Sequence, residues 1–144
     1  MVEFERLLDQ AGSLPDDGED KIAHLKRALD LYRGQFLVEF YSEWSEELRR
    51  QLEGKYLNAM LSLEAIMENR GEYTNAIGLL EKLLDIDPYH EEAYCKLIKL
   101  QFARGDKVAA ERTYRRYSKT VSAEMGLSPQ PWLENLRRGT SITE

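Results

Sequence analysis

Apolar residues recur every three or four positions along most of the chain, with charged and polar residues between them. This spacing, seen for example in Ile22, Leu25 and Leu29, gathers the apolar side chains on one face of an α-helix. The pattern predicts an all-α fold. Its helices are expected over residues 1–11, 21–32, about 42–69 with Trp44 at the start, 72–86, 89–103, 106–124, and from Ser128 onward.

Two interruptions separate the first predicted helices. Residues 12–20 combine Gly, Pro and acidic residues, which is typical of a solvated loop, and Arg33-Gly34 is expected to end the second helix. The apolar segment 35–41 is short for another full helix. We expect a packed loop there whose aromatic side chains close one end of the core, and the alternative is an exposed aromatic patch for a partner. These side chains are Phe36, Phe40 and Tyr41.

One short pattern occurs twice in the second half of the chain. Arg70-Gly71-Glu72-Tyr73 returns as Arg104-Gly105-Asp106-Lys107, at an offset of 34 residues. That period indicates a repeated pair of helices joined by a turn. Gly71 and Gly105 suit the left-handed residue that ends a helix. The same offset pairs Met60 with Tyr94, Leu63 with Leu97, Ala76 with Ala110, and Leu80 with Tyr114.

The repeated segment resembles a tetratricopeptide repeat (TPR), on its small and apolar positions. Asp87-Pro88 fits the cap and first residue of the following helix. The resemblance implies a right-handed stack of helical hairpins, with a repeat core over 57–124 and flanking helices at both ends. Two repeats are fewer than such a stack usually needs, so the flanking helices are expected to complete it. The residues that carry the resemblance are Ala76, Leu80, Pro88, Ala110 and Tyr114, and Trp132, Leu133 and Leu136 are expected to cover the second repeat.

Composition narrows the class of protein. A chain of 144 residues fits one domain, 1–144, and a net charge of −6 argues against a free-standing nucleic-acid binder. The single cysteine excludes an internal disulfide. The sequence has neither a leader peptide at its start nor an apolar run long enough for a membrane span, so we expect a cytoplasmic protein without membrane partners.

Several segments, in this order, resemble the bacterial transcriptional activator domain of antibiotic regulatory proteins of the SARP type and of related response regulators. The first is similar to the motif A-L-x-L-W-R-G, with Tyr32 in place of Trp, and the last is similar to E-x-G-x-x-P. The segments are Ala28-Leu29-Asp30-Leu31-Tyr32-Arg33-Gly34, Phe36-Leu37, Trp44, Arg70-Gly71, Tyr114-Arg115-Arg116 and Glu124-Met125-Gly126-Leu127-Ser128-Pro129.

This resemblance implies a regulatory module that controls transcription through protein contacts and takes part in signal transduction. Such proteins usually carry a winged-helix DNA-binding domain before this one, so DNA contact would be indirect and that domain is expected upstream of Met1. The expected partner is the DNA-binding domain, another component of the transcription complex, or a second copy of the chain. The alternatives are a small-molecule sensor and a free-standing TPR adaptor or oligomerisation module.

No residue pattern indicates catalysis, a metal site or a cofactor. His24 and His90 lie far apart in the sequence, without the spacing of a metal site, and we expect a protein that is not an enzyme. Four acidic residues in one loop lack the order of a calcium-binding loop, and acids before a helix are favoured by its dipole. They are Asp16, Asp17, Glu19 and Asp20.

Two surfaces are candidates for partner binding. Residues 1–99 hold 12 basic and 21 acidic side chains, whereas residues 100–144 hold 8 basic and 5 acidic ones. The predicted basic docking face is Arg112, Arg115, Arg116 and Lys119, and the alternative is internal pairing or solvation. The predicted partner groove, which flanking helices would otherwise fill, is Asn58, Leu61, Ala65, Glu68, Asn69, Glu92, Cys95, Lys99 and Phe102.

Overall fold

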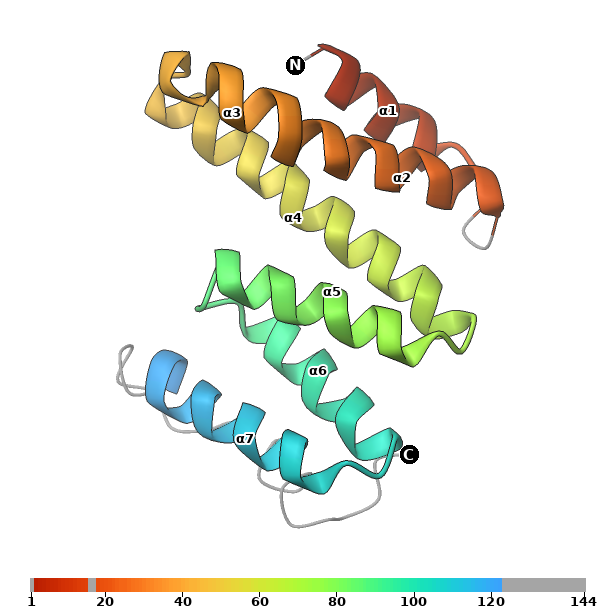
Figure 1. Ribbon diagram of the computed structural model, residues 1–144, viewed down its shortest axis with the longest axis vertical. Helices are drawn as coiled ribbons and strands as arrows, with labels where there is room; N and C mark the ends of the chain where they lie inside the picture. The colour runs from red at the N-terminus through yellow and green to blue at the C-terminus, as the bar shows by residue number, and fades with distance from the viewer. Residues whose placement is uncertain (1, 16–17, 123–144) are drawn as a thin grey trace. The chain divides into compact units, whose positions relative to one another are not determined.

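The computed structural model describes residues 2–15 and 18–122, and the secondary structure of these residues is entirely helical (Figure 1). The all-α prediction is therefore confirmed. The chain forms two compact units, Met1–Ala76 and Ile77–Glu144, each described by itself. The helices are α1 Val2–Gly12, α2 Glu19–Leu31, α3 Leu37–Phe40, α4 Glu46–Asn69, α5 Tyr73–Ile86, α6 Glu91–Ala103 and α7 Lys107–Tyr117.

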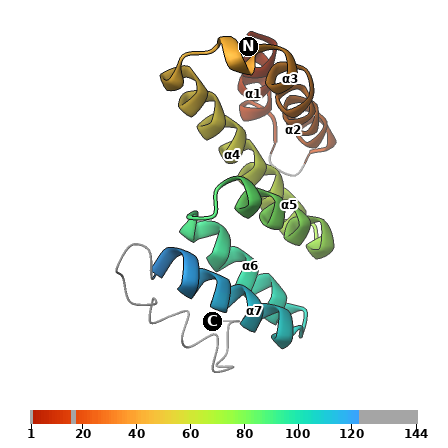
Figure 2. The ribbon, with the colours of Figure 1, turned by 60° about the vertical axis from the view of Figure 1, so that its left-hand side comes forward.

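In the first unit, α1, α2 and α4 lie side by side (Figures 1 and 2). Their buried faces meet in an aromatic cluster around Tyr32, whose side chain is 3% exposed. The ring centroids of Phe4 and Tyr56 lie 5.3 and 4.6 Å from that of Tyr32, and the Trp44 ring stacks at 6.2 Å. Tyr32, which stands where the motif A-L-x-L-W-R-G has Trp, thus lies at the centre of this unit's core.

The segment after α2 differs from the prediction. Arg33-Gly34 does not end the helical path, because Tyr32–Phe36 forms a π-helical turn that leads directly into α3. A 3-10 turn, Tyr41–Glu43, follows. The expected packed loop is therefore helical. Phe40 and Tyr41 are 36% and 42% exposed, so these two side chains do not close the core as expected.

Helix α4 begins at Glu46, a few residues later than the sequence pattern predicts. Trp44 is extended and precedes the helix, and Ser45 is the N-cap, because its hydroxyl oxygen accepts a hydrogen bond from the Leu48 amide at 3.1 Å. A serine cap satisfies an amide that would otherwise have no partner at the helix start. The cap, rather than the first large apolar residue, therefore sets the boundary.

Both repeated turns adopt the same backbone conformation. Gly71 and Gly105 each have φ of +78°, as predicted. The amide of Glu72 donates to the Met67 carbonyl at 2.8 Å, and the amide of Asp106 donates to Gln101 at 2.9 Å. These six-residue hydrogen bonds are those of a Schellman motif, which ends a helix at a left-handed glycine. The two turns, which lie 34 residues apart, therefore have the same backbone hydrogen bonds.

The start of α6 corrects the Asp87-Pro88 prediction. His90 is the N-cap, and its Nδ1 accepts a hydrogen bond from the Ala93 amide at 3.2 Å. Asp87 instead accepts from the Tyr89 amide at 3.2 Å and so stabilises a turn before the helix. His90 therefore has a structural role, although the sequence alone placed it on a helix.

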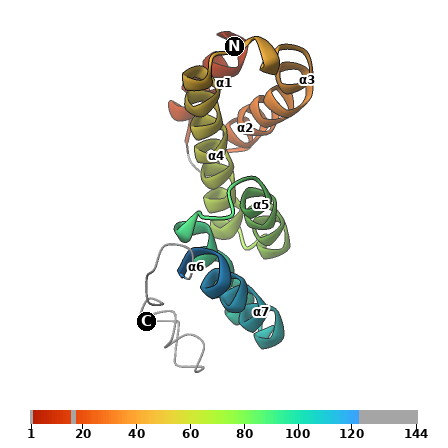
Figure 3. The ribbon, with the colours of Figure 1, turned by 90° about the vertical axis from the view of Figure 1, so that its left-hand side faces the viewer.

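The second unit contains the α6–α7 hairpin (Figure 3). Its buried apolar side chains come from α5, α6 and α7, and they include Leu84, Tyr94 and Tyr117. The hairpin also buries a polar pair, in which the Thr113 hydroxyl donates to Gln101 Oε1 at 2.7 Å. Because both side chains are hydrogen-bonded, their burial inside the hairpin is tolerated.

The predicted helix over 106–124 changes geometry before its end. α7 stops at Tyr117, and Ser118–Ser122 forms a π-helical turn. Ser122 stands where the first copy of the repeat has Pro88. The predicted terminal helix from Ser128, with Trp132, Leu133 and Leu136, lies outside the described residues.

Candidate interaction surfaces

Five residues of the predicted groove form one accessible stripe on α4. Each of the five lies three or four residues from another member, as residues on one helix face do, and Glu68 and Asn69 are adjacent. Asn58 and Asn69 are exposed, while Leu61, Ala65 and Glu68 are partly exposed. Most positions between them, including Met60 and Leu63, are buried, whereas Ser62 is exposed. We call this set of five residues the α4 stripe.

The remaining four residues form an equivalent stripe on α6, in the second unit. Glu92 and Lys99 are exposed, and Cys95 and Phe102 are partly exposed. Each lies 34 residues after a member of the α4 stripe. The residues at Tyr94 and Leu97, equivalent to Met60 and Leu63, are again buried. We call this set the α6 stripe; it and the α4 stripe belong to different units.

Cys95 is the only sulfhydryl of the chain. Burial is the main cause that raises the pKa of the Cys95 thiol to about 12, and the nearby Glu91 carboxylate contributes to this rise. The thiolate is the nucleophilic form of cysteine, so at neutral pH this thiol is protonated and weakly reactive. Within the α6 stripe, Cys95 is therefore suited to apolar contact rather than covalent chemistry.

The four residues of the predicted basic face do not share one environment. Arg115 and Arg116, on α7, line a surface pocket of about 500 Å³ together with Lys119 from the π-helical turn, whereas Arg112 does not line it. The Arg115 side chain is 75% exposed and lies 3.8 Å from Glu111. A single α-helical face was expected, and the π-helical turn breaks that regularity.

Arg116 is held by contacts inside its own unit. Its guanidinium donates to the Leu84 carbonyl at 3.1 Å, lies 3.8 Å from Asp85, and sits 5.9 Å from the centroid of the Tyr94 ring. These contacts join α7 to α5 and α6. Internal pairing, the alternative reading of the basic face, thus applies to Arg116, and Arg115 and Lys119 are the better candidates for contact with a partner.

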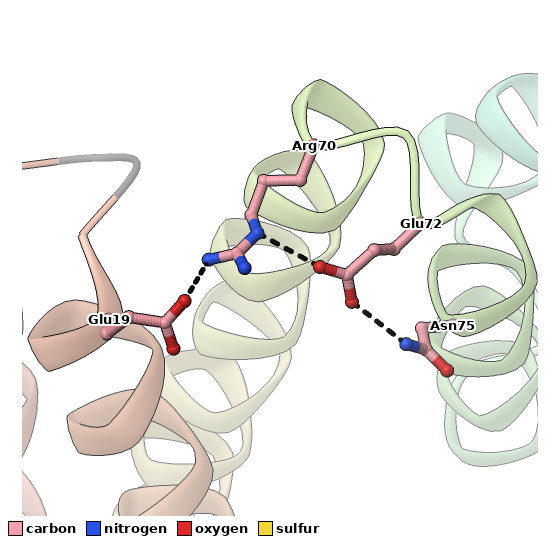
Figure 4. A network of polar contacts seen from close by, with 4 residues as sticks. All are labelled: Glu19, Arg70, Glu72 and Asn75. Carbon is pink, nitrogen blue, oxygen red and sulfur yellow. Dashed lines mark hydrogen bonds and ion pairs between the residues drawn. The ribbon is translucent and has the colours of Figure 1, made fainter.

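The first repeated turn carries a network of polar side chains that the sequence did not indicate (Figure 4). Arg70 donates to Glu19, the first residue of α2, at 2.7 Å, and its Nε lies 2.9 Å from Glu72. Glu72 also accepts from the Asn75 amide group at 3.0 Å. The Glu19 carboxylate, hydrogen-bonded to Arg70, raises the pKa of that guanidinium. One side chain thereby joins α2 to the α4–α5 turn.

The acidic loop and the histidines have structural partners where they are described. Glu19 bonds Arg70, and His24 Nδ1 lies 2.7 Å from the Asp20 carbonyl. Asp16 and Asp17 lie outside the described residues. Within 2–15 and 18–122, no three or more histidine, cysteine, aspartate or glutamate side chains are grouped as a metal site would require. None of the helices in those residues is both long and apolar enough to span a bilayer.

Glu64, on α4, is the one acidic side chain among the described buried residues, and it is fully enclosed. Glu64 lies on the buried face of α4, but the pattern of apolar residues in the sequence does not distinguish it from an exposed glutamate. A glutamate in a helix is most often exposed, so sequence reasoning had no signal for its burial.

Comparison with known proteins identifies the family of this chain. A family model for the bacterial transcriptional activator domain matches residues 1–139. The chain therefore belongs to the bacterial transcriptional activator domain family, as its motifs indicated. Its role lies in bacterial transcriptional activation. The searches among curated proteins and solved structures returned no match.

Proposed function

We propose that this chain is a cytoplasmic regulatory module of a transcription activator, which acts through protein contacts rather than through catalysis or a cofactor. Its partner is a protein of the transcription complex, and its influence on DNA is indirect. Family membership supports the role in transcriptional activation, and the two stripes support the proposal that the chain acts through protein contacts. It extends the TPR resemblance, in which helix faces of this kind receive partner segments.

The observation that carries the proposal is the recurrence of accessible side chains at equivalent helix positions. None of the nine stripe residues is buried, although they alternate with fully packed positions on α4 and α6. The stripes mix apolar, amide and charged side chains, as protein interfaces do. Leu61 and Phe102 are the largest apolar members of their stripes, and partly exposed side chains of this kind can enter a partner's pocket.

The test replaces these two anchors with arginine, one at a time, in the intact activator. Leu61→Arg and Phe102→Arg are each expected to reduce transcription from the target promoter by about tenfold, which is the effect of losing one interface anchor. Binding to purified RNA polymerase and to the activator's DNA-binding part should show which contact is lost. Circular dichroism and thermal unfolding check that each variant is folded.

Two matched controls place the same arginine outside the stripes. Tyr73→Arg serves for the first unit and Val108→Arg for the second, since these side chains are 40% and 69% exposed. The controls should activate transcription as the unchanged chain does. Normal activation by folded Leu61→Arg and Phe102→Arg variants would contradict the proposal. A loss in the control variants as large as in the stripe variants would also contradict it.

A further inference from the structure

A pocket of about 270 Å³ lies wholly within the first unit, among α1, α2 and α4, and Asn58 is the residue that it shares with the α4 stripe. The lining residues of each helix lie three or four positions from one another, with some adjacent pairs on α1 and α4, so each helix presents one face to the pocket. The space exists because small residues occur where larger ones would fill it. These are Ala11 and Gly12 on α1, and Ala59 and Ser62 on α4.

The pocket combines an apolar floor with a charged rim. Leu25, Ala11 and Ala59 are 1–4% exposed and form the floor. The rim holds two carboxylates and two ammonium groups, together with the amide of Asn58 and the hydroxyl of Ser62. The four charged residues are Glu5, Asp9, Lys21 and Lys55.

One pair of these charges already connects two helices. Lys55 on α4 is hydrogen-bonded to Glu5 on α1, and both side chains remain 41–48% exposed. The pair thus closes one edge of the pocket and fixes α1 beside α4. Asp9 and Lys21 place a second negative and a second positive charge on the rim, from α1 and α2.

We propose that this pocket binds a free amino acid with an apolar side chain. The volume corresponds to about nine water molecules, which matches a compact ligand of this kind. The apolar side chain covers the floor, the α-ammonium group lies toward Asp9, and the α-carboxylate lies toward Lys21. Opposite charges around an apolar floor favour a zwitterion over a ligand with a single charge.

This binding site goes beyond the proposed protein contacts. It would give the activator a response to amino-acid supply, because ligand binding stabilises the arrangement of α1, α2 and α4. Leu61 and Phe102, the residues that test the protein contacts, do not line the pocket. Failure of one proposal therefore leaves the other intact, and the two can be told apart.

The experiment is calorimetric titration of the full chain with L-leucine and L-phenylalanine. At least one of them should bind with a dissociation constant of about 1 mM or lower. Leucine amide, which lacks the carboxylate, and N-acetylleucine, which lacks the ammonium group, should each bind at least about tenfold more weakly. Equal binding of all three leucine compounds, or no binding of either amino acid, overturns the proposal.

Two variants locate the site, each with a matched control. Ser62→Phe fills the pocket and should abolish binding, whereas Ala23→Phe adds the same ring at an exposed position of α2 outside the pocket. Asp9→Asn should weaken binding about tenfold, and Asp30→Asn, also exposed and outside the pocket, should not. Undiminished binding by a folded Ser62→Phe variant shows that the ligand binds elsewhere and overturns the assignment.

Discussion

The two repeated turns share one backbone conformation but use their side chains differently. Gly71 and Gly105 have the same φ, and the hydrogen bonds around them correspond one to one. In the second unit, the Asp106 carboxylate caps α7 by accepting from the Ala109 amide at 3.1 Å. In the first unit, Glu72 instead bonds Arg70 and Asn75.

This difference follows from one methylene group. Aspartate is short enough to reach the amide of its own helix, and it ranks among the best N-cap residues, whereas the longer glutamate does not. Glutamate extends past the helix start and is available to a neighbouring side chain. The glycine thus determines the backbone conformation of the turn. The acidic residue that follows the glycine determines whether a side chain caps the next helix or bonds to neighbouring side chains.

The buried tyrosines extend the contrast between the units and give the largest expected effect. The Tyr117 hydroxyl of the second unit donates to Glu91 at 2.8 Å. The Tyr32 side chain of the first unit instead packs against the rings of Phe4, Trp44 and Tyr56. Burial, together with a smaller contribution from the Glu53 carboxylate, raises the pKa of Tyr32 from 10.0 to about 12.

The folded state therefore retains the Tyr32 proton when the unfolded state has lost it. This contribution to stability is complete below pH 10 and is lost as the pH rises from 10 to about 12, by at most about 2–3 kcal/mol. Tyr32→Phe should remove this part of the loss of stability at alkaline pH. Burial also raises the pKa of Tyr56, so a smaller loss of stability should remain in the variant.

Urea unfolding at neutral pH and near pH 12 measures this effect. Fluorescence of Trp44, whose ring stacks on Tyr32, reports on the first unit when the other tryptophan is replaced by Trp132→Phe. Tyr73→Phe is the control, since Tyr73 is 40% exposed. Equal alkaline loss in the Tyr32→Phe variant and the unchanged chain would refute the account of Tyr32.

The second prediction separates capping from bridging. Asp106→Ala should lower the free energy of unfolding of the second unit by about 1 kcal/mol, because α7 loses its N-cap. Asp106→Asn retains a capping oxygen and should cost much less. Glu72→Ala should cost less than Asp106→Ala, since the amides of α5 receive no side-chain cap from Glu72 in the described contacts.

Hydrogen exchange, followed by peptide, resolves the two helix starts in one experiment. Faster exchange at the start of α7 is expected in Asp106→Ala, with α5 unchanged, and Asp106→Asn should resemble the unchanged chain. If Glu72→Ala destabilised its helix start as strongly as Asp106→Ala, the two turns would be equivalent after all.

Periodicity and the repeat predicted much of the fold. The starts of α5 and α7 lie within one residue of their predicted positions, because Gly71 and Gly105 end the preceding helices by a local backbone requirement. Boundaries set by side-chain hydrogen bonds were harder to predict. Ser45 and His90 cap their helices, but a capping residue differs from its neighbours only once its hydrogen bond is known.

The candidate surfaces were predictable only in part. Exposure along α4 and α6 follows from helix periodicity, so the sequence predicts which of these side chains are accessible, and their role as a partner groove stays a prediction. The internal contacts of Arg116 depend on Leu84 and Tyr94, which are distant in sequence, and the pocket depends on three helices meeting. Such features require tertiary structure, and no local pattern encodes them.

The smallest expected effect concerns the Arg70 network in Figure 4. Glu19 is 77% exposed, so solvent screens its attraction to Arg70, and such pairs contribute little to global stability. Arg70→Gln should therefore lower the urea midpoint only slightly at low salt, and the difference from the unchanged chain should vanish at about 1 M salt. Arg70→Lys, which keeps the charge but lacks the forked guanidinium, should fall between the two, because an ammonium group cannot hold Glu19 and Glu72 in the same geometry. A loss that persisted at high salt would mean that Arg70 stabilises the turn by packing rather than by charge.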